Sequence, residues 1–426
     1  MKKIDVYFLN NSQLNDNKIN IVINADSVTV KLNIFNIGNY EFGKELEKIS
    51  DLIKIHDTIK RINLIFDKNI NVLTTNKILV HVHNVLYQYY KITREIKLYQ
   101  VTDESVKIMK ELDHYKNIVM DPNKNPNTYL EYVKSRVPES HEISVYNVKD
   151  TDDFPLTKAV GIGSQYPGHF VHIKPKHENQ TKKTIYLVGK SITFDSGGMN
   201  IKDNSMVDMK IDMTGSAIIV SVLNLISGTE YAKNSNIHLI LPIVENMIGN
   251  TATRPGYVVK TICGKAVEIY DTDAEGRLCL ADGFEFVQNS LIRGKDLSKC
   301  LVLDIATLTG NTTSITNGVT SIMSSNEKGS DYSDKLMEIG EEIGEYLEFI
   351  KIRPEYLDML KSKVADIKNI SPTAKSGFII AASFLNFFMD SKIPWVHIDL
   401  GKGTYIDEVA QSHGVNLLFE FIKNIQ

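Results

Sequence analysis

Short apolar runs alternate with longer amphipathic stretches from the start of the chain. Three early runs have the length and β-branched content of strands. They are residues 19–23, 28–34 and 62–66. Residues 77–96 instead repeat apolar side chains at helical spacing, so this part of the chain predicts an α/β layer arrangement. His81 and His83 lie in the helical stretch, where residues two apart point away from each other, and we expect no metal pair there.

A second series of apolar runs follows a cluster of proline and asparagine at residues 121–127. Such a cluster is typical of a turn, and it precedes a helical stretch over residues 128–136, so we place a domain boundary near it. The strand candidates beyond it are residues 159–163, 170–173, 185–188, 237–243, 301–305 and 396–400. Apolar strands interleaved with helices indicate a mostly parallel sheet that is covered on both faces.

The length, net charge and cysteine content of the chain limit the classes of protein to which it can belong. A chain of 426 residues exceeds what one core usually supports, so two domains are expected. The 48 basic and 52 acidic residues leave a net charge of −4, which indicates no nucleic-acid partner and no anionic membrane. No apolar run is long enough to span a bilayer, and no secretory signal pattern begins the sequence. We therefore expect a cytoplasmic protein, whose three cysteines are core residues.

The first segment with candidate chemistry follows an apolar strand. Residues 187–198 read LVGKSITFDSGG and place Lys190 and Asp195 before two glycines, at a strand end where open α/β sheets bind ligands. A surface lysine and an aspartate that caps a turn would explain the same residues. A phosphate-binding loop would need a glycine where Thr184 stands, so the Gly-Lys-Ser sequence does not indicate one.

Two further segments add carboxylates before apolar helices. Residues 209–215 read MKIDMTG and carry Asp212, and residues 271–278 read DTDAEGRL and carry Asp273 and Glu275. Each aspartate alone would be an ordinary helix cap. Together with the aspartate of the first segment, these side chains would converge on one crevice, where their charges repel unless cations neutralise them. Oxygen ligands without a histidine or thiolate cluster point to Mg²⁺, Mn²⁺ or a two-zinc site.

The three segments resemble the diagnostic segments of the leucine aminopeptidase family, the cytosolic dinuclear metallopeptidases. The likeness runs from Pro126 to the C-terminus and includes residues 246–247, 254–256, 304–310 and 365–369. It implies a smaller N-terminal α/β domain over residues 1–122, a linker helix region over 123–148 and a catalytic α/β domain over 149–426. The catalytic domain would have a central mixed sheet flanked by helices.

The resemblance also implies the ligands of two divalent ions, which would be Zn, Mn, Co or Mg. Lys190, Asp195, Asp212 and Glu275 would bind the tighter ion, and Asp195, Asp273 and Glu275 the looser one. Asp195 and Glu275 would bridge the two ions, because a carboxylate has two usable oxygens. Lys190 would bind as a neutral amine, with its pKa lowered by burial and by the two ions.

The activity implied is release of N-terminal amino acids, preferably leucine-like, from peptides with a free N-terminus. A hydroxide activated by the two metal ions would attack the first peptide carbonyl. Lys202 would stabilise the oxyanion, and Arg277 would anchor a bicarbonate ion that carries the proton. Met209, Thr307 and Gly310 would line the side-chain pocket. Family members are homohexamers, which implies the same assembly here.

Some positions depart from the family pattern without touching a proposed ligand. Ser191 stands where a glycine is usual, Thr214 replaces a small residue, and Asp271 replaces an asparagine. A catalytically silenced homologue that acts as a binding or assembly module is therefore the main alternative. A metal-dependent phosphohydrolase is a third hypothesis. It is disfavoured because the segments offer few basic residues besides Lys202 and Arg277 to bind the phosphate group of a substrate.

Overall fold

The structure, a computed structural model, describes most of the chain. The described residues are 2–9, 19–23, 27–33, 59–87, 95–204, 206–310, 321–406 and 408–425, with single residues 44, 48, 312 and 316. The chain is divided into two compact units, Met1–Asp113 and His114–Gln426. The boundary between them lies within helix α3 (Asp103–Met120). The linker region expected over residues 123–148 contains helix α4 (Pro126–Ser135) and strand β6 (His141–Asn147).

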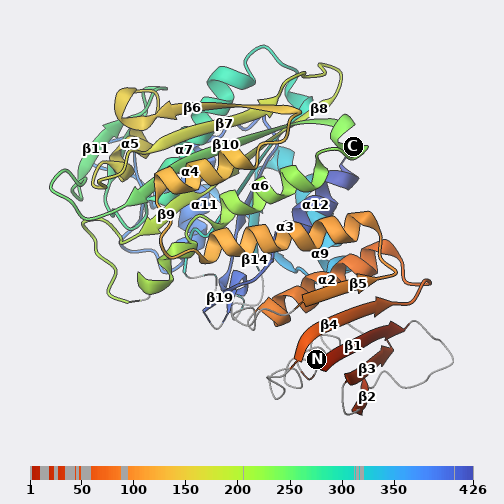
Figure 1. Ribbon diagram of the computed structural model, residues 1–426. Coiled ribbons are helices and arrows are strands. Elements are labelled where there is room, and N and C mark those ends of the chain that lie inside the picture. Colours follow the sequence, from red (N-terminus) through yellow and green to blue (C-terminus); the bar gives the residue numbers. More distant parts are fainter. Residues whose placement is uncertain are drawn as a thin grey trace. The chain divides into compact units, whose positions relative to one another are not determined.

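The first unit has a five-stranded sheet in the order β2-β3-β1-β4-β5 (Figure 1). Its strands are β1 (Lys2–Leu9), β2 (Ile19–Ile23), β3 (Ser27–Asn33), β4 (Ile59–Phe66) and β5 (Glu95–Tyr99). Buried side chains of β1, β3 and β4 share one core with Ile78, Leu79 and Val82 of helix α2 (Val72–Tyr87). The α/β prediction for this region is therefore confirmed.

The helix predicted over residues 77–96 is wrong at its end. Ile96 belongs to β5 and pairs with Ile62 of β4, while residues 88–94 lie outside the described part of the chain. Pairing with a neighbouring strand outweighs the local apolar spacing there. In α2 itself, His83 Nε2 lies 2.9 Å from Asp113 Oδ1, and burial lowers the pKa of His81 to about 4.

The second unit is built on a nine-stranded mixed sheet. Eight strands follow the order β15-β14-β17-β13-β8-β10-β7-β6, and β9 pairs with β10. Besides β6, the strands are β7 (His169–Pro175), β8 (Lys183–Gly189), β9 (Ser191–Asp195), β10 (Ser235–Asn246), β13 (Cys300–Ala306), β14 (Ser321–Ser325), β15 (Leu347–Phe349) and β17 (Trp395–Asp399). Strands β10, β8, β13 and β17 run parallel, whereas β7 and β14 join them antiparallel. The predicted mixed sheet is thus confirmed.

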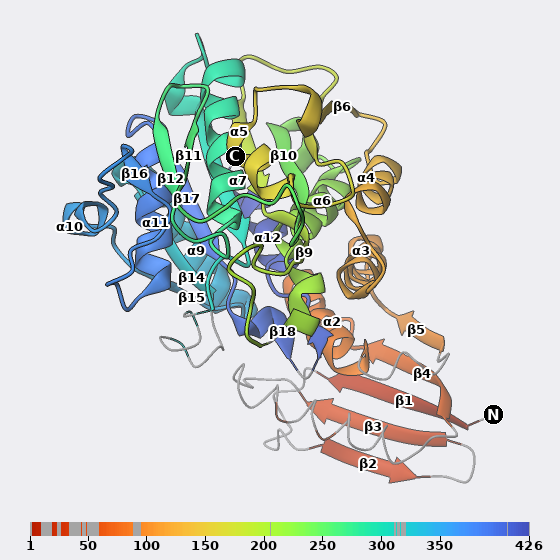
Figure 2. The ribbon, with the colours of Figure 1, turned by 90° about the vertical axis from the view of Figure 1, so that its left-hand side faces the viewer.

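Helices cover both faces of this sheet. Besides α3 and α4, the helices of this unit are α5 (Pro155–Gly161), α6 (Thr214–Ile226), α7 (Gly276–Phe286), α9 (Ser330–Ile343), α10 (Pro354–Asp358), α11 (Gly377–Phe388) and α12 (Val415–Asn424), of which α10 packs on α11. Figure 2 shows the sheet nearly edge-on, with α6 on one side and α7 and α11 on the other. Helix α6 packs on β8, β10 and β13 and against α12, while α7 packs on β8 and β10 and against α5 and α11.

Two small sheets complete the second unit. One has the order β11-β12-β16, from β11 (Tyr257–Lys260), β12 (Ala266–Ile269) and β16 (Ile367–Lys368). The other pairs β18 (Tyr405–Ile406) with β19 (Val409–Ala410). The stretch Met206–Ile226 is long and apolar enough to cross a membrane, but 78% of its most apolar window is buried inside the protein. Its apolar character is therefore explained by its position in the core of the second unit.

Five of the six strands predicted for this part of the chain are confirmed, but the strand predicted over residues 159–163 is wrong. That run belongs to α5, which begins at Pro155, a residue that suits the first turn of a helix. A short apolar run has the same appearance in a buried helix and in a buried strand. Among the cysteines, Cys279 and Cys300 are buried as expected, whereas Cys263 is exposed.

Candidate metal centre

The candidate residues gather where parallel strands of the second unit end. Strands β8, β10 and β13 are parallel neighbours, so their carboxyl ends lie at one edge of the sheet. Lys190 follows β8, Asn246 ends β10 and Thr307 follows β13. This edge is where open α/β sheets bind ligands.

Lys190 connects two of the predicted carboxylates in the interior. Its Nζ lies 2.7 Å from Asp212 Oδ2 and 2.9 Å from Glu275 Oε1, and it donates a hydrogen bond of 3.0 Å to the Thr307 carbonyl. Glu275 directly precedes α7, whose first residue is Gly276. A Cβ at Gly276 would lie 2.5 Å from Lys190 Cε, so only glycine lets the lysine reach this position.

Lys202 connects the other two predicted carboxylates. Its Nζ lies 2.8 Å from Asp195 Oδ2 and 2.5 Å from Asp273 Oδ1. The side chain of Lys202 is 17% exposed, against 4% for Lys190. One carboxylate oxygen each from Asp195, Asp273 and Glu275 lies within 4.8 Å of the other two. The fold therefore brings the five predicted ligands and Lys202 into one cluster.

The electrostatics of the cluster show an excess of negative charge. Burial raises the pKa of Asp212 well above its usual range, although Lys190 lowers it. Burial and then the charge of Glu275 raise the pKa of Asp195, and burial with the neighbouring carboxylates raises the pKa of Asp273 to about 7. Glu275 is the exception, since the two lysines bring its pKa below the usual value despite burial. Two ammonium groups thus leave four converging carboxylates undercompensated, and this donor set fits divalent cations.

Lys190 itself is held as an ammonium group in this arrangement. Burial alone would lower its pKa, but Asp212 and Glu275 raise it above the ordinary value. The predicted binding of a metal ion through a neutral amine would therefore require cations that offset the two carboxylates.

Arg277 lies beside the cluster, in the first turn of α7. Its Nη1 donates a hydrogen bond of 2.7 Å to the carbonyl of Asn369. Burial lowers the pKa of the guanidinium to about 10, although the charges of Glu275 and Asp399 oppose the shift. The side chain remains a cation near neutral pH.

Of the three predicted pocket residues, Thr307 contacts the cluster directly. Its hydroxyl donates to Asp212 Oδ1 at 2.8 Å. Met209 is half-buried in the short 3₁₀ helix Met206–Ile211, and its carbonyl accepts a 3.3 Å bond from the amide of Asp212. Gly310 is exposed, with nothing within 4 Å of a Cβ placed there, and residue 311 lies outside the described part of the chain.

The three residues that depart from the family pattern are accommodated locally. The Ser191 hydroxyl donates to the carbonyl of Gly189 at 2.8 Å, and the Thr214 hydroxyl donates to the carbonyl of Ile211 at 2.6 Å. Asp271 Oδ1 accepts a 2.9 Å bond from the amide of Asp273. The extra carboxylate of Asp271 is thus used within its own turn.

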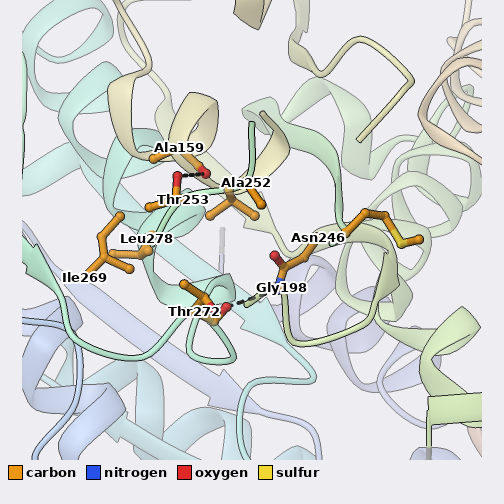
Figure 3. Close-up of a pocket in the computed structure, with 10 residues that line it drawn as sticks. Ala159, Gly198, Asn246, Ala252, Thr253, Ile269, Thr272 and Leu278 are labelled. Atoms are coloured by element: carbon orange, nitrogen blue, oxygen red, sulfur yellow. Dashed lines mark hydrogen bonds between the residues drawn. The ribbon is translucent and has the colours of Figure 1, made fainter. Parts of the chain in front are cut away.

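Two asparagines of the site were not singled out from the sequence. Asn246 donates to Asp195 Oδ1 at 2.7 Å and to the carbonyl of Thr272 at 3.0 Å. Figure 3 shows this amide reaching Thr272 at the edge of a small, largely apolar hollow. Asn369 lies beside Arg277, as described above. Both asparagines lie in segments that resemble the family, which was the available signal, but nothing local indicated their partners.

Comparison with known proteins identifies the family of the chain. Residues 114–418 match the sequence model described as the cytosol aminopeptidase family, catalytic domain. A probable cytosol aminopeptidase of Prochlorococcus marinus strain AS9601 is 36% identical over 323 residues, which are 72% of this chain and 64% of that protein. One of Rickettsia rickettsii strain Sheila Smith is 34% identical over 313 residues, which are 70% of this chain and 60% of that protein. The chain thus spans less than two thirds of the length of these relatives.

Solved structures share the fold. The leucyl aminopeptidase from Leishmania major in complex with actinonin superimposes with a TM-score of 0.84 at 19% identity, covering 99% of this chain and 92% of its own. The bottromycin maturation enzyme BotP in complex with Mn gives a TM-score of 0.81 at 22% identity, covering 99% of both chains. From the matched residues and the identity to its relatives, the chain belongs to the cytosol aminopeptidase family.

Proposed function

We propose that this protein is a metal-dependent aminopeptidase that releases leucine-like N-terminal residues from peptides. The observation that carries the proposal is the cluster of four carboxylates and two lysines at the carboxyl edge of the sheet. It is formed by the catalytic-domain region of the chain. Carboxylates that crowd this closely without cations would be a cost to folding, so a cation-dependent role explains their presence.

Five residues would hold two divalent cations. Asp195, Asp273 and Glu275 offer the close group of oxygens, and Lys190 pairs with both Glu275 and Asp212. When bound, the cations would polarise the peptide carbonyl, supply a nucleophile near neutral pH and attract the free amine of the substrate. Mn²⁺ is the first ion to test, because BotP, which shares the fold, was solved with Mn.

The remaining residues of the site would act on the substrate. Lys202 is the more exposed of the two lysines, so its ammonium group can approach the oxyanion that forms at the attacked carbonyl. Arg277, a buried cation in the first turn of α7, would anchor a bicarbonate ion for proton transfer. Thr307, together with Met209 and Gly310, would form the pocket for the first side chain.

The test is hydrolysis of leucine p-nitroanilide by protein stripped with a chelator and then supplied with Mn²⁺, Co²⁺, Zn²⁺ or Mg²⁺. We expect activity to return with metal, and N-acetyl-leucine p-nitroanilide to remain uncleaved because it lacks a free amine. Turnover of phosphomonoesters in place of amides would support the phosphohydrolase hypothesis. Silence on every substrate and metal would favour the silenced homologue.

Assembly and location belong to the same proposal. We expect a homohexamer in the cytoplasm, by analogy with the family. Light scattering at micromolar concentration should give six times the mass of the 48.1 kDa chain. A mass equal to one chain would contradict the hexamer without touching the chemistry of the site.

A further inference from the structure

The side chain of Asn369 makes four hydrogen bonds to the segment that carries two predicted ligands. Its Oδ1 accepts hydrogen bonds from the amides of Tyr270 (2.9 Å) and Asp271 (3.2 Å). Its Nδ2 donates to the carbonyls of Asp271 (2.6 Å) and Ala274 (3.1 Å). The residue is fully buried. One side chain therefore satisfies four backbone groups of residues 270–274, on which Asp273 lies.

The backbone of Asn369 extends the same contact to α7. Its carbonyl accepts the bond from Arg277 Nη1, and its amide donates to the carbonyl of Glu268 at 3.1 Å. Asn369 directly follows β16, which pairs with β12 in the small sheet, so it is placed by strand register. It thus links the strand before the carboxylate segment to the helix after it.

Other parts of the chain hold the same segment through Thr272. The amide of Thr272 donates to Asn200 Oδ1 at 3.0 Å, its hydroxyl donates to the carbonyl of Gly197 at 2.7 Å, and its carbonyl accepts from Asn246. The backbone of residues 270–274 is therefore held by Asn369 and, separately, by Asn200 and Asn246. The side chains of Asp273 and Glu275 remain for the cluster.

We infer that Asn369 is a positioning residue that orients the carboxylates of Asp273 and Glu275 for divalent cations. This inference rests on the proposed function. An asparagine is required because a short amide combines an acceptor with two donors. Aspartate would lose both donated bonds and would face two carbonyls with a negative charge. Alanine would remove all four side-chain hydrogen bonds and leave these backbone groups without their partner.

A general loss of stability must be separated from loss of positioning, and Asn326 provides a matched control. Its Oδ1 accepts from the amides of Gly329 (2.9 Å) and Trp395 (3.2 Å), and its Nδ2 donates to the carbonyl of Ile393 (2.7 Å). This asparagine clamps a turn in the same manner. Asn326 lies at the amino end of β17, whereas the cluster of carboxylates and lysines lies at the carboxyl edge of the sheet.

The experiment compares full-length wild type with the variants Asn369→Asp, Asn369→Ala and Asn326→Ala. Mn²⁺ is titrated into chelator-stripped protein by calorimetry, and melting temperature and kcat and KM for leucine p-nitroanilide are measured alongside. We expect both Asn369 variants to weaken Mn²⁺ binding about 10- to 100-fold, as loss of a residue that orients metal ligands does, and to lower kcat more than they raise KM. Asn326→Ala should lower the melting temperature and leave Mn²⁺ affinity unchanged.

Each outcome bears on a different statement. Wild type that binds no Mn²⁺ or other divalent ion would overturn the proposed function. Wild type that binds, with Asn369→Asp binding equally tightly, would overturn the positioning role and leave the proposed function standing. Equal weakening in Asn326→Ala would also overturn it, because the effect would then come from stability alone. Asn369→Asp has nearly the volume of the native residue, which keeps the test available if the alanine variant fails to fold.

Discussion

At the residue scale, two lysines with the same charge occupy different surroundings in one cluster. Lys190 is enclosed between Asp212 and Glu275, whereas Lys202 pairs with Asp195 and Asp273 and is partly exposed. Because an enclosed group cannot reach a substrate, the proposed function gives Lys190 to the metal ions and Lys202 to the charge that develops on the substrate. The distinction follows from burial, because the two side chains are chemically identical.

This assignment predicts separable losses of function. Glu275→Ala should reduce the metal bound per chain, because this carboxylate adjoins both the close oxygen group and Lys190. Lys202→Ala should retain its metal and lower kcat by about 10²- to 10³-fold, the typical effect of losing one oxyanion-stabilising group. Metal analysis and steady-state kinetics on both variants check this. Two metals per chain and near-normal rates in Glu275→Ala would show that the ligand assignment is wrong.

At the scale of elements, a buried carboxyl joins the two helices α5 and α7 beside the sheet. Asp282 of α7 accepts a 2.6 Å hydrogen bond from the amide of Thr157, in the first turn of α5. Burial raises the pKa of Asp282 to about 7. In the unfolded chain this carboxyl has its ordinary pKa of 3.8. The folded protein therefore keeps the proton on Asp282 at pH values where the unfolded chain has lost it.

The sign of the resulting pH dependence follows from that difference. Between about pH 4 and pH 7 the folded state binds more protons, so the contribution of Asp282 to stability falls as the pH rises and is constant above that window. Asp282→Asn should remove this slope, which amounts to about 1.4 kcal/mol for each unit of pKa difference. Urea unfolding of wild type and variant at several pH values measures it. Parallel profiles for the two proteins would contradict the prediction.

On the scale of the whole molecule, each of the two units of the chain has a hydrophobic core of its own. One core joins β1, β3, β4 and α2 in the first unit, and a larger one surrounds α7 and α11 in the second. The cluster of carboxylates and lysines belongs to the second unit, so cations that bind there should stabilise that unit. A ligand that binds only the folded state raises the free energy of unfolding by RT ln(1 + [L]/Kd). This increase is about 2.7 kcal/mol when the ligand is at 100 times its Kd.

The expected result is a melting temperature that rises by a few degrees with Mn²⁺, when unfolding of the second unit is observed. Trp395, the single tryptophan of the chain, is fully buried in that unit, so its fluorescence follows the relevant transition. The shift should be absent with chelator and much smaller in Glu275→Ala. An equal shift in that variant would mean that Mn²⁺ acts elsewhere on the protein.

The sequence by itself determined the local features of this protein. The sequence predicted the α/β alternation, most strand positions and the three segments that carry carboxylates. These features could be predicted because the spacing of apolar residues and short motifs involve only residues that are near one another in the sequence. Local pattern failed at residues 159–163, where a helix beginning at Pro155 and a buried strand have the same apolar signature. It failed again at Ile96, where pairing with β4 decided the conformation.

Only the tertiary structure decided which groups meet. Nothing in the sequence near Asn369 indicates that it holds residues 270–274, and Asn246 likewise reaches Asp195 only because β9 and β10 are paired. These contacts join residues 51 to 99 positions apart, and such contacts depend on strand register and helix packing. The enclosure of Lys190 and the exposure of Lys202 have the same origin, because burial is a property of the packed chain and local sequence does not encode it.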